Sequence, residues 1–205
     1  MLKIEKEYNE KYGEVITNDT ERIELLKKSL SSHQVEEYIE TLNKIKSTKW
    51  LEQTFTIYLL PKGTPRPRSG KYGTFYVKGA KNNRKYFEKY LIDRHITFIN
   101  TPTIFKCKTF LPTPSSMTKV EKVLAEEGYI RPISKPDWDN LAKTYCDMIQ
   151  GFVIYDDAII IRGETDKYYS LKPRIEITLK WMEEFDSKFN KRKIEKILQR
   201  KEEAK

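Results

Sequence analysis

Cysteine and histidine are scarce in this chain of 205 residues, which contains two of each. Cys107 and Cys146 are too few for a framework of disulfides or for a zinc site built from cysteines. We interpret them as buried thiols in a reducing compartment. His33 and His95 lie in unrelated segments, without the spacing of metal ligands. We therefore expect no thiol or imidazole chemistry from this sequence.

Long apolar runs are also missing, and the sequence shows no signal peptide. No stretch approaches the roughly 20 apolar residues that a membrane-spanning helix needs. We therefore expect a cytoplasmic protein with no membrane partner. Hydrophobic residues make up 38% of the chain and charged residues 34%, which still leaves enough isoleucine, leucine and aromatic side chains for a core.

Positive charge dominates the chain, and it is unevenly distributed. The net charge is +9; residues 1–50 contribute −1, residues 51–182 contribute +8 and residues 183–205 contribute +2. A basic surface attracts polyanions such as nucleic acids. The middle segment is therefore the part expected to meet such a partner.

Apolar periodicity predicts an α/β fold, a mixed β-sheet with packed helices over residues 51–182. A helical hairpin is expected within residues 1–50, serving dimerisation, docking or stability, and a charged helix or tail at 183–205. The last two strands are predicted as a hairpin-like pair. The expected strands are 53–60, 103–111, 158–169 and 174–181, and the expected helices of the middle segment are 82–94, 118–128 and 139–150.

Aspartates gather in one short stretch, residues 135–157. Apolar residues between 139 and 150 recur at helical spacing, and Asp139, Lys143 and Asp147 stand four apart on the opposite face. The apolar run 158–161 is typical of a buried strand. A helix entrance therefore carries one acidic pair, Asp137 and Asp139, and a strand entrance carries the other, Asp156 and Asp157.

Clustered acids repel one another unless a cation lies among them. Mg²⁺ takes oxygen ligands and is bound by one or two carboxylates together with substrate phosphate. In phosphodiester hydrolysis, two such ions hold the attacking water and the leaving oxygen. Lys143 would neutralise phosphate charge. Each residue also has an ordinary alternative: a helix cap for Asp137 or Asp139, a surface ion pair for Lys143 and a turn for Asp156 and Asp157.

The pattern in this stretch resembles the RusA family of Holliday junction resolvases. The resemblance covers roughly Gln53 to Trp181 and includes a basic loop after the first strand and a closing strand at 174–177. It implies a RusA-like fold, a Mg²⁺ cofactor, a four-way or branched DNA substrate and a homodimer. From general ion chemistry, we expect that Mn²⁺ can substitute for Mg²⁺. The motif residues are Lys135, Pro136, Asp137, Asp139, Asn140, Leu141, Lys143, Asp147, Gly151, Asp156 and Asp157.

Residue by residue, the resemblance implies that Asp137, Asp139 and Asp157 hold Mg²⁺, with Asp156 beside them. It further implies that Lys143 is the catalytic lysine, and that Asp147 and Asn140 support the site. One departure is visible. Where the family usually has Ser-Gln after the acidic pair, this chain has Ala158-Ile159, whose side chains cannot form hydrogen bonds.

Candidate DNA contacts come mainly from the basic loop 61–73, which its prolines and glycines exclude from a helix or a central strand. Arginine can grip phosphate through two hydrogen bonds, although such a loop can equally be only a solvated one. Lys119, Lys122 and Lys167 are weaker candidates with an ordinary surface role as the alternative. The predicted DNA-binding residues are Lys62, Arg66, Arg68, Lys71 and Lys135.

The function expected from these features is a Mg²⁺-dependent, structure-selective endodeoxyribonuclease that resolves Holliday junctions in DNA recombination and repair. Two alternatives remain open. One is a protein that binds branched DNA without cleaving it, and the other is a nuclease for RNA or for other branched DNA.

Overall fold

A computed structural model describes residues 19–64, 68–70, 73–75, 86–91 and 96–185. The chain divides into two compact units: Met1–Ser47 together with Asp186–Lys205, and Thr48–Phe185. Most of the predicted helix or tail at 183–205 lies outside the described residues.

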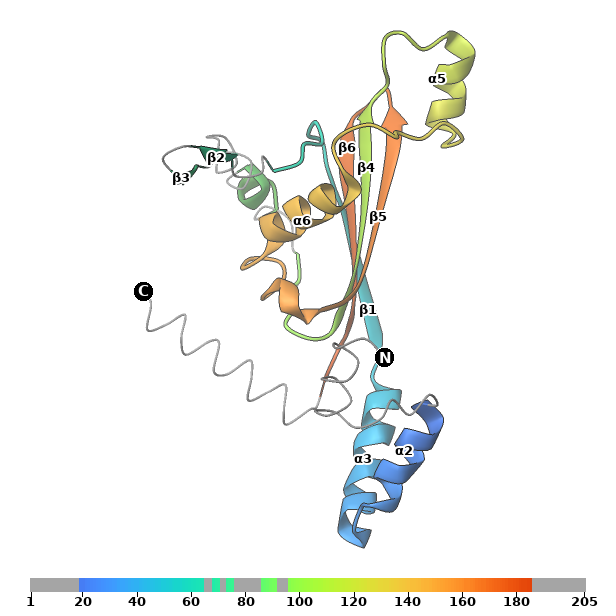
Figure 1. Ribbon diagram of the computed structural model, residues 1–205, viewed down its shortest axis with the longest axis vertical. Coiled ribbons are helices and arrows are strands. Elements are labelled where there is room, and N and C mark those ends of the chain that lie inside the picture. The colour runs from blue at the N-terminus through green and yellow to red at the C-terminus, as the bar shows by residue number, and fades with distance from the viewer. Residues whose placement is uncertain (1–18, 65–67, 71–72, 76–85, 92–95, 186–205) are drawn as a thin grey trace, which may run out of the picture. The chain divides into compact units, whose positions relative to one another are not determined.

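The second unit contains a mixed four-stranded sheet in the order β1-β6-β4-β5, so the predicted α/β fold with a mixed sheet is confirmed (Figure 1). β4 pairs parallel with β5 and antiparallel with β6, and β1 pairs antiparallel with β6. The strands are β1 (Trp50–Ile57), β4 (Thr103–Pro112), β5 (Ile160–Ser170) and β6 (Arg174–Met182).

The connection from β5 to β6 differs from the prediction, because these strands are not neighbours. β4 lies between them and pairs with both. The prediction of a hairpin-like pair was therefore wrong. The short connection at 171–173 matches a tight turn, but sequence spacing does not reveal which strand occupies the space between two others.

The apolar run before β5 also differs from the prediction. Ala158 and Ile159 belong to a short 3₁₀ helix, η1 (Asp157–Ile159), and the strand begins only at Ile160. Ile161 is 63% exposed, because β5 is an edge strand of the sheet. The prediction of a buried strand at 158–161 was therefore wrong.

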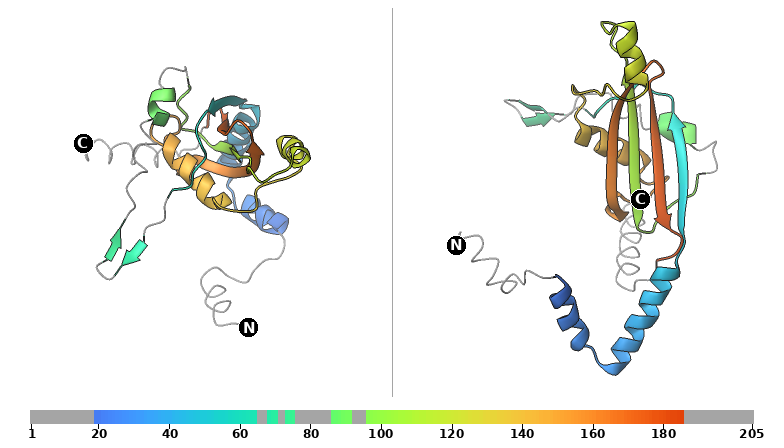
Figure 2. Two further views of the ribbon diagram at one scale, coloured as in Figure 1. Left: turned by 90° about the horizontal axis from the view of Figure 1, so that it is seen from above. Right: turned by 90° about the vertical axis from the view of Figure 1, so that its right-hand side faces the viewer.

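The helix that carries the acidic motif, α6 (Trp138–Ile149), lies across one face of the sheet (Figure 2). Its apolar stripe is buried as predicted, and it packs into the same core as the alternate residues of β4 that point inward. Burying one such side chain stabilises the fold by about 1.5–3 kcal/mol. The buried apolar side chains of α6 are Leu141, Tyr145, Cys146, Met148 and Ile149.

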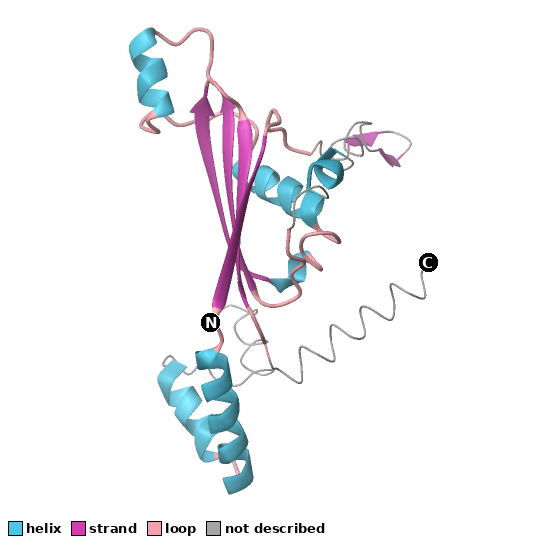
Figure 3. Cartoon of the chain, turned by 180° about the vertical axis from the view of Figure 1, so that it is seen from behind, coloured by secondary structure: helices cyan, strands magenta, loops and turns pink. Residues whose placement is uncertain are grey.

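The face of the sheet opposite α6 carries charged side chains on β4 and β5; Figure 3 shows these strands from behind. Lys106 and Lys108 alternate along β4 with buried residues. Lys106 Nζ lies 3.1 Å from Glu164 Oε2 on the neighbouring β5. One solvated face is ordinary for a sheet with antiparallel pairs.

α5 (Lys119–Glu126) follows β4, and the predicted capping box at its start is confirmed. Thr118 Oγ1 accepts a hydrogen bond from the Glu121 amide, and Glu121 accepts one from the Thr118 amide. Lys119 is exposed and Lys122 is half-buried.

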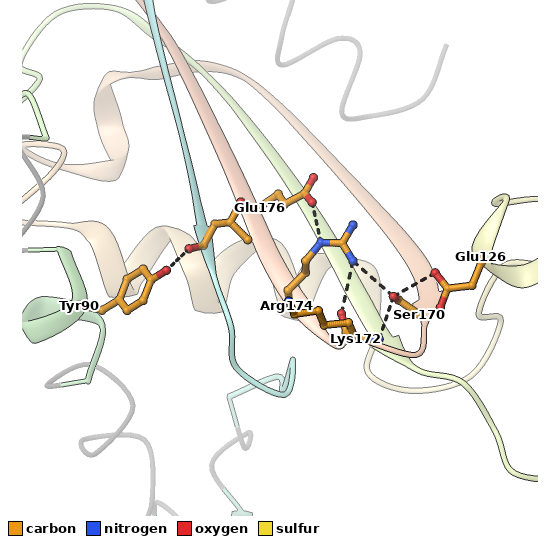
Figure 4. A network of polar contacts seen from close by, with 7 residues as sticks. Tyr90, Glu126, Ser170, Lys172, Arg174 and Glu176 are labelled. Carbon is orange, nitrogen blue, oxygen red and sulfur yellow. Dashed lines mark hydrogen bonds and ion pairs between the residues drawn. The ribbon is translucent and has the colours of Figure 1, made fainter.

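A polar network ties the end of α5 to the turn between β5 and β6 (Figure 4). Glu126 accepts hydrogen bonds from the Ser170 hydroxyl, at 3.2 Å, and from the Leu171 amide. Arg174 donates to Ser170 Oγ at 3.3 Å and to Glu176 Oε1 at 2.7 Å. α5 is therefore fixed to this end of the sheet.

The segment predicted as a basic loop contains a small two-stranded sheet of its own, β2 (Arg68–Gly70) and β3 (Gly73–Phe75). A helix is observed at 86–91, inside the predicted 82–94. Its Phe87 and Leu91 are buried as expected. Tyr86 was predicted to point inward but is 45% exposed.

In the first unit, α2 (Asp19–Lys28) and α3 (Ser32–Ser47) form the predicted pair of helices around Ser31-Ser32. The Ser31 amide donates to Gln34 Oε1 at 2.9 Å, which confirms the helix start predicted there. Neither helix has a buried residue. No helix among the described residues is long and apolar enough to cross a bilayer.

Candidate functional site

The first acidic pair lies at the start of α6. Asp137 occupies the N-cap position, with extended backbone angles of φ −67° and ψ 146°, but its side chain makes no cap hydrogen bond. Its backbone carbonyl accepts a hydrogen bond from the Leu141 amide. Asp139 lies in the first turn, where a negative charge is favoured by the helix dipole. The capping alternative therefore does not account for the Asp137 carboxylate.

Lys143 and Asp147 extend this face of α6 toward its other end. Lys143 Nζ lies 3.5 Å from Asp147 Oδ1, one helical turn apart, and the lysine side chain is largely exposed. Such an exposed pair contributes only about 0.3–0.5 kcal/mol to stability. The structure thus shows the surface ion pair that was the ordinary alternative for Lys143, and its catalytic role stays a prediction.

The second acidic pair lies at the start of η1 and is held by hydrogen bonds. Asp156 Oδ1 accepts from the Ala158 amide at 3.0 Å, and Asp156 Oδ2 accepts from Gln150 Nε2 at 2.9 Å. Both carboxylate oxygens of Asp156 are thus engaged. Asp157 follows as the first residue of η1 and is exposed.

Electrostatics connect the second pair with α6. Burial and then the hydrogen bond and charge of Asp156 raise the pKa of the Asp157 carboxyl above its usual value. The ammonium group of Lys143 lowers the same pKa, and the charge of Asp147 raises it. Asp156, Asp157, Lys143 and Asp147 therefore influence one another electrostatically, and these four residues are here called the acidic cluster.

The thiol of Cys146 lies beside this cluster. Burial, followed by the charges of Asp157 and Asp147, raises its pKa to about 12. Burial also raises the pKa of Cys107. Both are free, buried thiols as predicted, and a thiol with so high a pKa is a poor nucleophile or metal ligand at neutral pH.

The donor set suits a hard divalent cation, because it consists of carboxylate oxygens with excess negative charge. Among the described residues, however, no three Asp, Glu, His or Cys side chains lie close enough together to hold a metal ion as a group. The predicted joint site of Asp137, Asp139 and Asp157 therefore stays a prediction. Mg²⁺ needs only one or two carboxylates, so Asp157 with its neighbours is compatible with it.

The backbone before the basic segment is fixed directly onto α6. The Lys62 amide donates to Tyr145 Oη at 3.0 Å, and the Thr64 amide donates to Thr144 Oγ1 at 2.7 Å. Asn140 Nδ2 donates to the Thr64 carbonyl at 3.2 Å. A helix that carries the acidic motif thus also holds the entrance to the predicted DNA-contacting segment.

Gly63 is required by this arrangement. A Cβ atom at this position would lie 2.4 Å from Asn140 Nδ2 and 3.0 Å from Asn140 Cγ. Asn140, predicted only as a supporting residue, therefore positions the loop through direct contact.

The predicted DNA-binding residues are only partly described. Lys62 and Lys135 are exposed, and Arg68 is placed in β2 by its backbone. Arg66 and Lys71 lie outside the described residues. Lys167, left open between a DNA contact and a surface role, donates to the Ser134 carbonyl at 2.6 Å and thereby holds the segment that leads into α6.

Sequence reasoning missed three residues around the site: Gln150, which holds Asp156, and Thr144 and Tyr145, which hold the loop. Tyr145 was assigned only to the apolar stripe. The hydroxyl and amide groups of the three residues were the available signal, but their partners lie in other segments and no local pattern reveals them.

Fold and site together define an α/β protein in which an acid-rich helix packs on a mixed sheet and carries a basic segment on its flank. The chain belongs to the RusA endodeoxyribonuclease family, whose model, Endodeoxyribonuclease RusA, matches residues 59–180. The chain is also similar to Uncharacterized protein YqaN of Bacillus subtilis (strain 168). That protein is 31% identical over 134 residues, which cover 62% of this chain and 94% of the relative. The resemblance inferred from the motif is confirmed.

Proposed function

We propose that this chain is a Mg²⁺-dependent, structure-selective endodeoxyribonuclease that resolves Holliday junctions by paired phosphodiester hydrolysis. The proposal is supported by the family match over residues 59–180, which includes α6 and the whole acidic cluster. The raised pKa of Asp157 is a second support, because desolvation and Asp156 disfavour its ionised form and a divalent cation would favour that form.

The side chains have separate roles in this proposal. Asp157, with Asp137 and Asp139, would hold the ion, and Asp156 would orient Asp157 while itself held by Gln150. Lys143 would neutralise charge that develops on the phosphate in the transition state. Bound Mg²⁺ would supply Lewis-acid activation of water and of the phosphate oxygens.

Exposed Lys62 and Lys135 would position the DNA through contacts with its phosphate backbone. Such contacts to phosphate carry no base sequence information, so junction choice would come from shape and deformability. A four-way junction has near two-fold symmetry, and a homodimer with two equivalent sites would make two matched cuts.

The first experiment measures cleavage of labelled four-way, flap, duplex and RNA substrates with Mg²⁺. We expect cleavage of the four-way junction in preference to the others, support by Mn²⁺, and binding without cleavage in Ca²⁺. Preferential cutting of a flap or of RNA would instead favour the alternative substrates.

Asp157→Asn tests whether the acidic cluster performs the reaction. We expect at least about a 100-fold fall in turnover, because even a group that only supports a metal ligand contributes about 10–100-fold. Asp19→Asn in α2 is the matched control. If the Asp157 variant cleaves as fast as the parent, the assignment is wrong, and if the parent binds junctions without cleaving, the protein is a junction binder.

Sedimentation equilibrium of the parent protein tests the proposed homodimer.

A further inference from the structure

One large aromatic side chain on α6 is not covered by the core. Helical spacing places Trp138 in line with Tyr145 and Ile149, which are seven and eleven residues further on. Those two are 2% and 0% exposed, whereas Trp138 is 63% exposed. The core reaches Leu141 in the first turn but does not cover Trp138, so most of the indole ring is exposed to solvent.

The start of α6 is firmly placed, so the ring has a fixed base. Arg131 Nε donates to the Lys167 carbonyl at 2.5 Å, and Lys167 Nζ donates to the Ser134 carbonyl at 2.6 Å. The segment before α6 is thus joined to β5 at two points. A binding group held in advance loses less entropy when its ligand arrives.

The surroundings of Trp138 indicate which partner it contacts. Its chain neighbours are Asp137 and Asp139, about 3.8 Å away between consecutive Cα atoms, and Lys135 is exposed close by in sequence. Charged neighbours on both sides are unlike the apolar surface that receives another protein. The unit that contains Trp138 also carries most of the positive charge, which favours a polyanion.

We propose that the Trp138 indole is a stacking platform for an unpaired nucleobase next to the phosphate that is cut. This rests on the proposed function, in which Asp137 and Asp139 help Asp157 to hold the ion that acts on that phosphate. Aromatic rings stack on bases of any sequence. In continuous duplex both faces of a base are already stacked, so a free face is offered only by an unpaired or extruded base. Trp138 therefore favours branched over continuous DNA.

The test measures equilibrium binding to a four-way junction and to a duplex of equal length in Ca²⁺. Trp138→Leu keeps an apolar side chain but removes the ring, and we expect junction affinity to fall about 5- to 150-fold. Duplex affinity should stay within about twofold, as for an ordinary surface substitution. Trp138→Phe should restore most of the junction affinity, and Trp50→Leu is the control for loss of an exposed tryptophan.

A second arm uses junctions in which single abasic nucleotides are placed at successive positions around the branch point. With the abasic nucleotide at one particular position, the parent protein should bind the junction no more tightly than Trp138→Leu does. The base on which Trp138 would stack is absent there. Unfolding midpoints of all variants by circular dichroism should agree, so that a folding defect is separated from a binding defect.

Three binding results overturn the inference, and a fourth result concerns the dimer. The three are unchanged junction binding by Trp138→Leu, an equal loss of affinity for junction and duplex, and tighter binding by the parent at every abasic position. A dimer that dissociates in Trp138→Leu also overturns it, since the ring would then contact a second copy. Cleavage by the parent tests the proposed function separately. Junction selectivity that is lost in Trp138→Leu supports stacking even if the parent does not cleave.

Discussion

α6 and α3 carry apolar stripes with similar spacing, but only one of them is buried. α6 buries six of its 12 residues against the sheet, whereas α3 buries none of its 16 residues. Periodicity therefore predicts that a helix forms and which side is apolar, but not what covers that side. The difference bears on function, because burial of one side of α6 fixes the opposite side, which carries Lys143 and Asp147.

The largest expected effect is a difference in stability between substitutions on the apolar sides of the two helices, of which only that of α6 is buried. Leu141 is fully buried in α6, whereas Ile39 of α3 is 49% exposed. We expect Leu141→Ala to lower the free energy of unfolding by about 2–5 kcal/mol, and Ile39→Ala to lower it by no more than about 0.5 kcal/mol. Denaturant unfolding measures both. Equal effects would show that α3 is packed as tightly as α6.

Substitutions on the exposed sides of the same two helices should differ in their effect on cleavage. Lys143→Ala is expected to lower kcat by about 10²–10³-fold, because its charge would act on the transition state. Junction binding should change by only a few-fold, as expected of a group used after binding. Lys44→Ala in α3 is the matched control and should alter neither quantity. A kcat that is unchanged in Lys143→Ala would remove the functional distinction between the two faces.

Two glutamines extend the comparison of α6 and α3: Gln150 follows the last residue of α6, and Gln34 lies in the first turn of α3. Gln150 donates to Asp156 at 2.9 Å, whereas Gln34 accepts from the Ser31 amide in the start of α3. Gln150→Ala should weaken Mg²⁺ binding by about 10–100-fold, because a group that orients a ligand is lost. Calorimetric titration with Mg²⁺ or Mn²⁺ measures this. Gln34→Ala should leave ion affinity unchanged, and an equal loss in both variants would indicate a general effect on folding.

The smallest expected effect concerns pH. The pKa of Asp157 is raised in the folded chain, so its ionised form is disfavoured there. This cost is present above the folded-state pKa and disappears as the pH falls below the ordinary value of 3.8. With a chelator present, Asp157→Asn should therefore be more stable than the parent at pH 7, by a few tenths of a kcal/mol because the side chain is exposed.

At pH 3 the two proteins should unfold at the same temperature. Asp19→Asn is again the control, because Asp19 pairs with Arg22 at 2.8 Å in α2 and should gain nothing at pH 7. A less stable Asp157→Asn at neutral pH would contradict the direction of the pKa shift.

Local patterns in the sequence predicted much of the fold. The stripe of α6, the capping box of Thr118 and Glu121, and the helix start at Ser31 all depend on residues within a few positions of one another. The order β1-β6-β4-β5 was not predicted, because strand neighbours are chosen by contacts between distant segments. The exposure of Ile161 depends on β5 being an edge strand, which composition does not reveal.

The site shows the same difference between contacts within one segment, which spacing predicts, and contacts between distant segments, which it does not. The four-residue spacing of Lys143 and Asp147 predicted their contact, and both act on the pKa of Asp157 as one cluster. The hydrogen bond from Gln150 to Asp156 and the contact of Gly63 with Asn140 bring together groups whose pairing no spacing rule gives. The joint metal site of Asp137, Asp139 and Asp157 remains a prediction.

The hydrogen bonds from Lys62 and Thr64 to α6 have a mechanical consequence. The backbone after β1 and the helix that carries the acids are joined by these hydrogen bonds, so a displacement of one would be transmitted to the other. A ligand that pulled on the backbone at Thr64 would act on Asn140 as well, because Asn140 Nδ2 donates to the Thr64 carbonyl. In the proposed nuclease, binding of nucleic acid by this segment would therefore also act on the helix that carries the acidic motif.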